Sequence, residues 1–111
     1  MASTFKNSVK PSVSVDGTIC YTAPALTTTT VIGLSAANTH STEVVYVDVS
    51  LTDVSQSVTG YMGKHLKVPT DGSIIVVGGE QKLVLEPGDY ITVKASLAAS
   101  VDVIASVLEV N

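Results

Sequence analysis

The 111-residue chain contains no tryptophan, no arginine and a single cysteine, and charged residues make up only 14% of it. Six lysines stand against ten acidic residues, which leaves a formal net charge of -4. This balance argues against nucleic-acid binding, because phosphate contacts need clustered Lys or Arg side chains. It argues equally against a polybasic membrane anchor. Since Cys20 has no second cysteine to pair with, an internal disulfide is excluded.

Long hydrophobic runs are also missing. The longest apolar stretches have the length of a strand, whereas a membrane-spanning helix needs about 20 residues. The chain starts Met-Ala-Ser-Thr-Phe-Lys, which lacks the apolar segment of a secretory signal. We therefore expect no signal peptide and no membrane contact.

Residues branched at Cβ are abundant by contrast, since 19 Val, 6 Ile and 13 Thr make up 38 of the 111 residues. Such side chains favour the pleated sheet over the helix. Alternating runs recur about every ten residues between turn residues, a spacing typical of sandwiches and jelly rolls. The sequence therefore predicts an all-β fold: a single antiparallel β-sandwich or jelly-roll-like domain of about seven to nine short strands.

The clearest strand is predicted over residues 43–51. Its two faces alternate, with Val45, Val47, Val49 and Leu51 on one side and Tyr46, Asp48 and Ser50 on the other. This pattern predicts one buried and one exposed face of an antiparallel strand.

Another strand is predicted over residues 27–35, with Thr28, Thr30, Ile32 and Leu34 on one face. A turn cluster is expected to follow it.

Turn residues indicate how other strands connect. Asp16-Gly17 separates the alternating runs 12–15 and 18–22, which predicts a hairpin. Pro87-Gly88 fits a type II turn, with proline and glycine at the two central positions.

The first 11 residues are polar, lack periodicity and end at Pro11. We therefore expect a flexible N-terminal arm over residues 1–11, followed by the sandwich domain over residues 12–111. Phe5 and the two lysines of the arm are candidates for contacts with a neighbouring subunit.

Side chains that bind metals are scattered along the chain. His40 and His65 fall in different predicted turns, and Cys20 is distant from both in sequence. Four aspartates fall in four separate turns: Asp16, Asp53, Asp71 and Asp89. Because a metal site needs converging ligands, we predict none and interpret the aspartates as turn formers.

Catalytic motifs are equally scarce. No Gly-x-Ser-x-Gly elbow occurs, and Gly78-Gly79 precedes a strand rather than the helix that would cradle a phosphate. The turn Glu86-Pro87-Gly88-Asp89 resembles turns of the cupins, but the His-x-His pair of a cupin metal site is absent. We therefore predict a protein that is not an enzyme, with no catalytic, cofactor-binding or metal-binding residue and no cofactor.

Aromatic residues are few, with one Phe and four Tyr. Sugar-binding sandwiches usually stack saccharides on exposed rings, and Tyr46 lies on the predicted polar face of its strand. A carbohydrate- or host-surface-binding module is therefore the alternative function, while cross-strand packing is the other interpretation of Tyr46.

Two predicted strand edges, residues 44–49 and 74–77, carry little charge and no proline. Such edges pair with other chains unless a partner covers them. We therefore expect a homo-oligomer or an obligate partner.

Residues 72–96 and the closing strand 100–109, with residues 27–34 upstream, carry a resemblance to a known family. In texture and turn order, residues 27–110 resemble the small β-sandwich virion structural proteins of tailed bacteriophages, of the head-decoration or neck and tail accessory type. The resemblance contains no catalytic motif and transfers no functional residue. It implies a virion structural protein that assembles in the host cytoplasm with copies of itself and with other capsid, neck or tail proteins.

Overall fold

The computed structural model describes residues 2–111, which form nine strands and no helix. The strands in chain order are β1 (Ser3–Lys10), β2 (Thr18–Thr22), β3 (Thr28–Asn38), β4 (Val45–Asp53), β5 (Val58–Val68), β6 (Ser73–Val77), β7 (Leu83–Leu85), β8 (Tyr90–Ala95) and β9 (Val101–Val110). The all-β prediction is confirmed. Residues 2–111 accordingly offer no helix able to cross a membrane.

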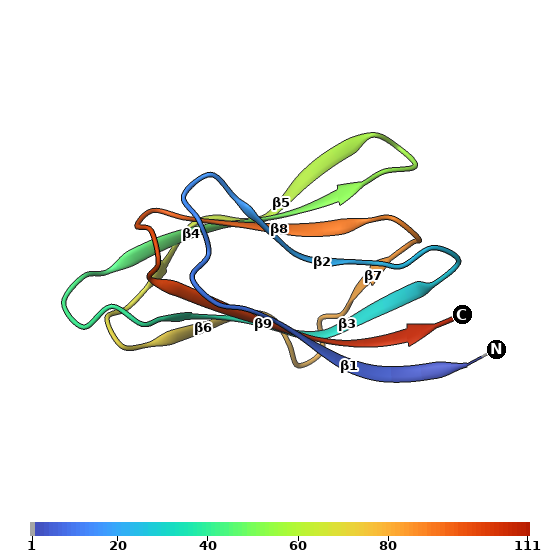
Figure 1. Ribbon diagram of the computed structural model, residues 1–111, viewed down its shortest axis with the longest axis horizontal. Helices are drawn as coiled ribbons and strands as arrows, with labels where there is room; N and C mark the ends of the chain where they lie inside the picture. Colours follow the sequence, from blue (N-terminus) through green and yellow to red (C-terminus); the bar gives the residue numbers. More distant parts are fainter. Residues whose placement is uncertain (1) are drawn as a thin grey trace.

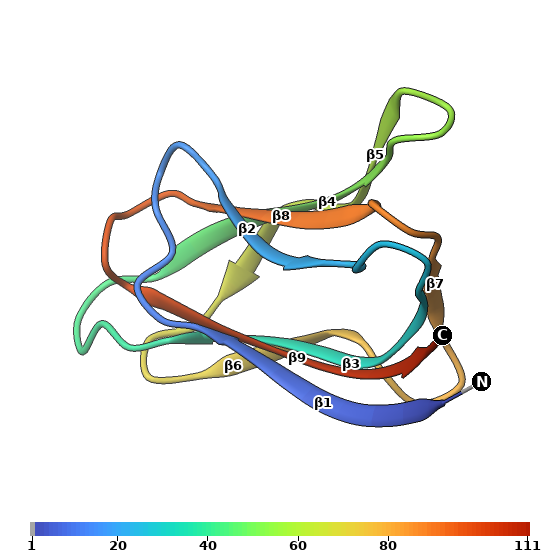
Figure 2. The same cartoon turned by 45° about the vertical axis from the view of Figure 1, so that its right-hand side comes forward.

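The strands form two antiparallel sheets that face each other as a sandwich (Figure 1). The five-stranded sheet has the order β1-β9-β3-β6, and β7 also pairs with β3. The four-stranded sheet has the order β2-β8-β4-β5. Both termini lie at the same end of the molecule, where β1 and β9 run side by side (Figures 1 and 2). The sandwich architecture predicted from the sequence is thereby confirmed.

Valine dominates the core between the sheets. Val45, Val47 and Val49 of β4 are fully buried, as their alternation predicts, and Val101 and Val103 of β9 are buried opposite them. Burying a side chain of this size stabilises the fold by about 1.5–3 kcal/mol. Because these positions point inward, the alternate positions of the same strands point to solvent and form the two outer faces of the sandwich.

The N-terminus corrects the prediction of a flexible arm over residues 1–11. Ser3–Lys10 form β1, which pairs with β9 along its whole length, while Met1 lies outside the described residues. Seven of the eight residues of β1 are exposed. Backbone hydrogen bonds to β9 therefore hold this strand, and burial of apolar side chains contributes little. Because few of its side chains are buried, the strand has no hydrophobic pattern in the sequence.

The predicted hairpin around Asp16-Gly17 is wrong in its first strand. Residues 11–17 instead cross from the five-stranded sheet, which contains β1, to the four-stranded sheet, which contains β2. In this crossing the Ser14 N–H donates to Thr18 Oγ1, and Ser14 Oγ accepts the Gly17 N–H, both at 3.1 Å. These side-chain hydrogen bonds replace a strand ladder.

The face predicted for residues 27–35 is also wrong. A β-bulge between Val31 and Gly33 shifts the pairing of β3 with β9 by one residue. Leu34 therefore faces the core together with Val31, whereas the sequence places it on the face of Ile32. The turn expected after residue 35 begins later, because β3 continues to Asn38.

One of the two predicted edges is confirmed. Residues 74–77 belong to β6, at the end of the five-stranded sheet, but residues 44–49 belong largely to β4, which lies between β8 and β5. The other strands that pair on one side alone, within the described residues, are β1, β2, β5 and β7.

Candidate functional site

The outer face of the five-stranded sheet carries large exposed hydrophobic residues among small polar ones. Residues directly opposite each other in an antiparallel pair point to the same side, so the register of β1, β9, β3, β6 and β7 identifies the outward positions. Five of these positions hold large hydrophobic residues that are 44–76% exposed: Phe5, Val9, Ile75, Val84 and Ile104. These five residues are called the apolar face below.

Charge is nearly absent from this surface. Among the outward strand residues within the described chain, Asp102 is the one with a charged side chain. The molecule measures 47 × 27 × 23 Å, so one broad side covers on the order of 1,000 Å², against roughly 800 Å² per partner in a standard protein interface. The apolar face is therefore a candidate protein interface.

The edge of this face is β1, whose side chains make few anchoring contacts. Lys6 Nζ lies 3.6 Å from Glu109 Oε1, and Lys6 is half exposed. Surface ion pairs of this kind contribute about 0–1 kcal/mol. Ser106 Oγ donates to Asn7 Oδ1 at 2.7 Å, and Ser8 Oγ donates to the carbonyl oxygen of Cys20 at 2.6 Å. Most of what holds β1 in place is therefore its backbone ladder with β9.

The outer face of the four-stranded sheet is different, since it carries an aromatic stack. The rings of Tyr46 and His65 lie parallel, with an interplanar angle of 4° and 4.1 Å between centroids. Tyr46 is thus on the polar face, as the sequence predicts, and it packs against a cross-strand neighbour. His65 was expected in a turn, but it lies within β5.

A β-bulge in β5 places His65 against Tyr46. Two residues of β5, Lys64 and His65, stand opposite Asp48 of β4, and His65 has φ = +58°. Left-handed backbone at a residue with a side chain costs about 1–3 kcal/mol. Asp48 Oδ1 stabilises the bulge by accepting the His65 N–H at 2.7 Å, while Asp48 Oδ2 lies 3.8 Å from Lys64 Nζ. The bulge therefore aims the imidazole at the tyrosine ring.

A hollow of about 280 Å³ lies beside the stacked rings, between β4–β5 and β8. Its lining includes the six residues Val15, Tyr46, Asp48, His65, Lys94 and Ser96. The sequence singles out Tyr46 and His65 in this group, but it gives no reason to place them together. Lys94 stands opposite Asp48 in the β4–β8 ladder, but the bulge that brings in His65 leaves no signal in the sequence.

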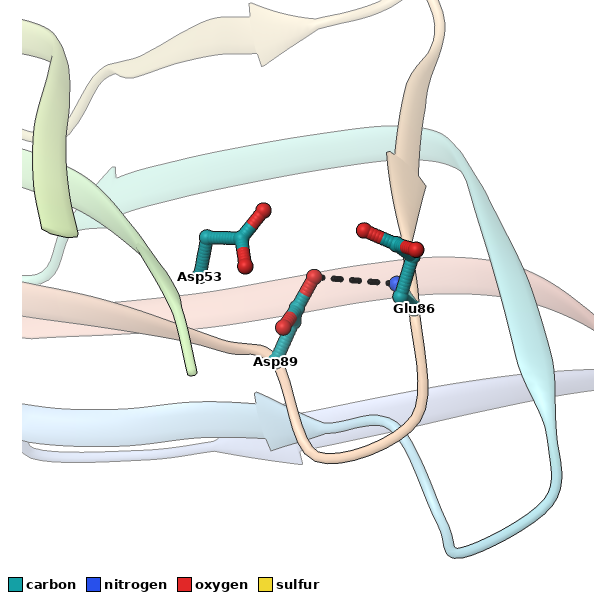
Figure 3. A group of neighbouring side chains, drawn as sticks. All are labelled: Asp53, Glu86 and Asp89. Carbon is teal, nitrogen blue, oxygen red and sulfur yellow. Dashed lines mark hydrogen bonds between the residues drawn. The ribbon is translucent and has the colours of Figure 1, made fainter. Parts of the chain in front are cut away.

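Three carboxyl groups that are distant in sequence converge at one end of the sandwich. Figure 3 shows Asp53, at the end of β4, together with Glu86 and Asp89, which flank the β7–β8 turn. One oxygen from each lies within 4.8 Å of the others. Asp53 and Asp89 lie at separate turns, as the sequence predicts, but their carboxyl groups converge because the β4–β5 and β7–β8 turns lie side by side.

Hydrogen bonds already occupy two members of this cluster. Asp89 is 2% exposed, and its two oxygens accept the N–H groups of Val54 and Glu86 at 3.1 and 3.0 Å. Asp53 accepts hydrogen bonds from the Ser55 hydroxyl and the Gln56 amide, which lower the pKa of the Asp53 carboxyl. Both aspartates thus stabilise turns, as the sequence predicts for each of them.

Two further titratable groups are buried in the core. Cys20 is 1% exposed and packs as a small core hydrophobe, and burial raises the pKa of its thiol to about 11. Tyr21 donates its hydroxyl to Glu109 Oε2 at 2.6 Å and pairs with Thr29 Oγ1 at 2.8 Å. Burial and the bond to Glu109 raise the pKa of Tyr21 to about 12. Neither group opens onto the hollow, so both are interpreted as structural.

The remaining predicted residues lie apart. His40 orders its own loop, because its Nδ1 accepts the N–H groups of Thr42 and Glu43 at 3.2 and 3.1 Å. Gly88 has φ = +90°, as a type II turn at Pro87-Gly88 requires.

No protein-family model matches the sequence, and no curated protein matches it. Among solved structures, the fold is similar to that of VP2 in the subviral particle of infectious bursal disease virus. The TM-score is 0.51 at 11% identity, over 96% of this chain and 32% of the VP2 chain. A pentameric capsid protein isolated from metagenomic phage sequences aligns with a TM-score of 0.44 at 18% identity, over 93% of this chain and 59% of that chain.

This chain therefore spans about a third of the length of VP2. At such low identity the likeness concerns the fold alone. The chain has an antiparallel β-sandwich of a kind found in a viral capsid protein.

Proposed function

We propose that the chain is a non-enzymatic structural protein of a virus particle, which assembles with copies of itself and with other virion proteins. Within this role we propose a capsid decoration protein or a neck or tail accessory protein of a tailed bacteriophage. The observation that carries the proposal is the apolar face, a broad sheet surface with five exposed hydrophobic residues and one charged one. The similarity in fold to VP2 of a subviral particle supports it.

The energetics of the apolar face favour a multivalent assembly over a free dimer. Full burial of one large apolar side chain contributes about 1.5–3 kcal/mol, and these five are already partly buried, so the face supplies roughly 5–10 kcal/mol. Association costs about 4–15 kcal/mol in lost translational, rotational and side-chain freedom. For a single contact between two copies, the free energy gained by burial is therefore about equal to the free energy lost on association. In a ring or shell every copy makes several contacts at once, which favours assembly.

The β1 strand supplies a second contact in this proposal. Because β1 depends on its ladder with β9 and buries few side chains, it can pair with β9 of a neighbouring copy in the same register. Exchange of an identical strand between copies creates an assembly at low cost in free energy. We propose that residues 1–11 act as such a tether.

Mass spectrometry of purified particles from the source virus tests the virion role directly. Tens to hundreds of copies per particle support a shell component, and a small symmetric number supports the neck or tail. Absence of the chain from purified particles contradicts the proposal.

Charge substitutions test the apolar face. Ile75→Lys should abolish self-association in sedimentation experiments at high protein concentration. Ile19→Lys is the matched control, because Ile19 is 48% exposed on the outer face of the four-stranded sheet. Equal association of wild type and Ile75→Lys, or equal loss in both variants, argues against this interface.

A paired cysteine substitution tests the strand exchange. Asn7 of β1 stands opposite Ser106 of β9 with their side chains in contact, so Asn7→Cys with Ser106→Cys places two thiols at disulfide distance. After oxidation of the assembled protein, exchange gives covalent multimers on a non-reducing gel. Monomers alone show that β1 pairs within its own chain. Deletion of residues 2–10 should then leave a folded sandwich that no longer assembles.

A further inference from the structure

The hollow beside Tyr46 and His65 combines three features of a ligand site: a strained residue, an aromatic surface and an uncompensated cation. We infer that it binds an acidic sugar, that is, a pyranose ring that carries a carboxylate. This inference does not rest on the proposed assembly role, because it concerns the opposite face of the sandwich.

The backbone at His65 is the first observation. A bulge and a left-handed φ at a residue with a side chain disturb the regular β4–β5 ladder, and Asp48 is committed to capturing the freed N–H. Such strain and such bulges concentrate where a side chain must be aimed at a ligand. Here the result is a pair of parallel rings at the border of the hollow.

The charges of this face are the second observation. The chain as a whole has a net charge of -4, yet three of its six lysines lie on this face: Lys64, Lys67 and Lys94. Within residues 2–111, the outward strand positions of the four-stranded sheet hold one acidic residue, Asp48. Asp48 already forms an ion pair with Lys64 and accepts the His65 N–H. Lys94 lines the hollow and makes no ion pair within the described chain. An anionic group on the ligand would supply the missing partner.

The size and the polar groups of the hollow point to a sugar. A volume of about 280 Å³ lies just below the roughly 300–1,000 Å³ of pockets for drug-sized ligands, which suits one ring rather than a long chain. Stacked aromatic rings offer an apolar surface to the C–H groups of a pyranose. Ser96 Oγ accepts the Tyr46 N–H at 2.9 Å and keeps its own proton to donate to a sugar oxygen.

Single-stranded nucleic acid is the competing ligand, because bases stack on aromatic rings and phosphates pair with lysines. Such binding needs a charged groove that follows several nucleotides, about 4–16 per site in sandwich-sized domains. The hollow spans one ring, and the chain has no arginine. The observations therefore favour the sugar.

Amide chemical shifts of the full-length, isotope-labelled protein test this inference. The probes are D-glucuronate, D-galacturonate and N-acetylneuraminate, each an acidic pyranose from a different glycan source. D-glucose and D-galactose are the matched neutral probes, and a thymidine oligonucleotide represents nucleic acid. We expect at least one acidic sugar to shift the amides of Tyr46, Lys94 and Ser96, with affinity at least about tenfold above its neutral counterpart.

Two variants and two controls locate the binding. Lys94→Gln and Tyr46→Leu should each weaken binding about tenfold, which corresponds to about 1.4 kcal/mol. Lys67→Gln and Tyr61→Leu carry the same replacements on the same face outside the hollow, and they should change affinity less than about threefold. Unchanged dispersion of the remaining amide signals verifies that each variant is folded.

Several results would overturn the inference. They are the absence of localised shifts with all three acidic sugars, equal affinity for acidic and neutral sugars, equal losses in variants and controls, and tighter binding of the oligonucleotide.

Discussion

Replacing Asp89 by alanine should remove the carboxylate that joins two turns of the sandwich. Asp89 is buried, and its two oxygens accept the N–H groups of Val54 and Glu86. A hydrogen bond to a charged group contributes about 1.5–3 kcal/mol, so two of them amount to roughly 3–6 kcal/mol. The substitution also removes repulsion from Asp53 and Glu86, both of which solvent reaches, and this screened repulsion is worth about 1 kcal/mol each. The free energy of unfolding of Asp89→Ala should therefore fall by roughly 1–4 kcal/mol.

Urea denaturation at neutral pH measures this loss, with an unchanged slope m indicating that two-state unfolding is retained. Asp89→Asn is the control, because asparagine keeps one acceptor oxygen and removes the charge. Its loss should be about half that of Asp89→Ala. If Asp89→Asn is more stable than the wild type, repulsion within the cluster outweighs the two hydrogen bonds, and the reasoning is refuted.

Three more outcomes follow from the buried and clustered groups. The Cys20 thiol stays protonated up to about pH 11 in the folded chain but ionises near 9 when unfolded, so stability present below pH 9 should fall between pH 9 and 11. When the free energy of unfolding is measured with urea at several pH values, Cys20→Ala should no longer lose stability between pH 9 and 10. Tyr21 does not contribute in this range, because its ionisation lowers stability only between about pH 10 and about pH 12. Tyr21→Phe removes the hydroxyl bonded to Thr29 and Glu109 and should lower the free energy of unfolding by about 1–3 kcal/mol, as measured by urea denaturation. Millimolar Ca²⁺ should not change the melting temperature, since Asp53 and Asp89 already accept hydrogen bonds; a rise of several degrees would contradict this assignment.

The sequence predicts the sandwich well wherever one face of a strand is buried. In β4, the branched residues Val45, Val47 and Val49 alternate with polar ones, and the structure buries each of them. The period of two is a direct consequence of the pleat, so it needs no knowledge of the partner strand. The same local logic explains the success at Gly88, whose turn conformation depends on its own residue type.

Register shifts cannot be predicted from the alternation within a single strand. The bulges at Ile32 in β3 and at His65 in β5 each add one residue to a strand, and each reverses the faces that follow. The position of a bulge depends on how the strand pairs with its partner, and the free energy that the bulge costs is shared by both strands. Alternation within residues 27–35 therefore predicts a strand but assigns Leu34 to the wrong face.

Long-range proximity is the other feature that the sequence does not contain. β1 pairs with β9, which is about a hundred residues away, through backbone groups that every residue possesses. Likewise Asp53 meets Glu86 and Asp89 only because two turns pack together. The candidate site depends on such contacts: Tyr46 is foreseeable as an exposed ring on a polar face, while its partners His65 and Lys94 come from two other strands.

The two outer faces of the sandwich restrict how the chain can be oriented in the proposed assembly. The apolar face loses its contact with water only if the five-stranded sheet turns toward a partner, and the four-stranded sheet then points away from that partner. In that orientation the hollow with its three neighbouring lysines stays open to solvent and to ligands. Attachment by the four-stranded sheet would instead bury Lys94 without an ion-pair partner from the described chain, and would leave the apolar face in water. The physical chemistry of the two faces therefore favours one orientation, in which assembly and ligand binding occupy opposite sides of the same small domain.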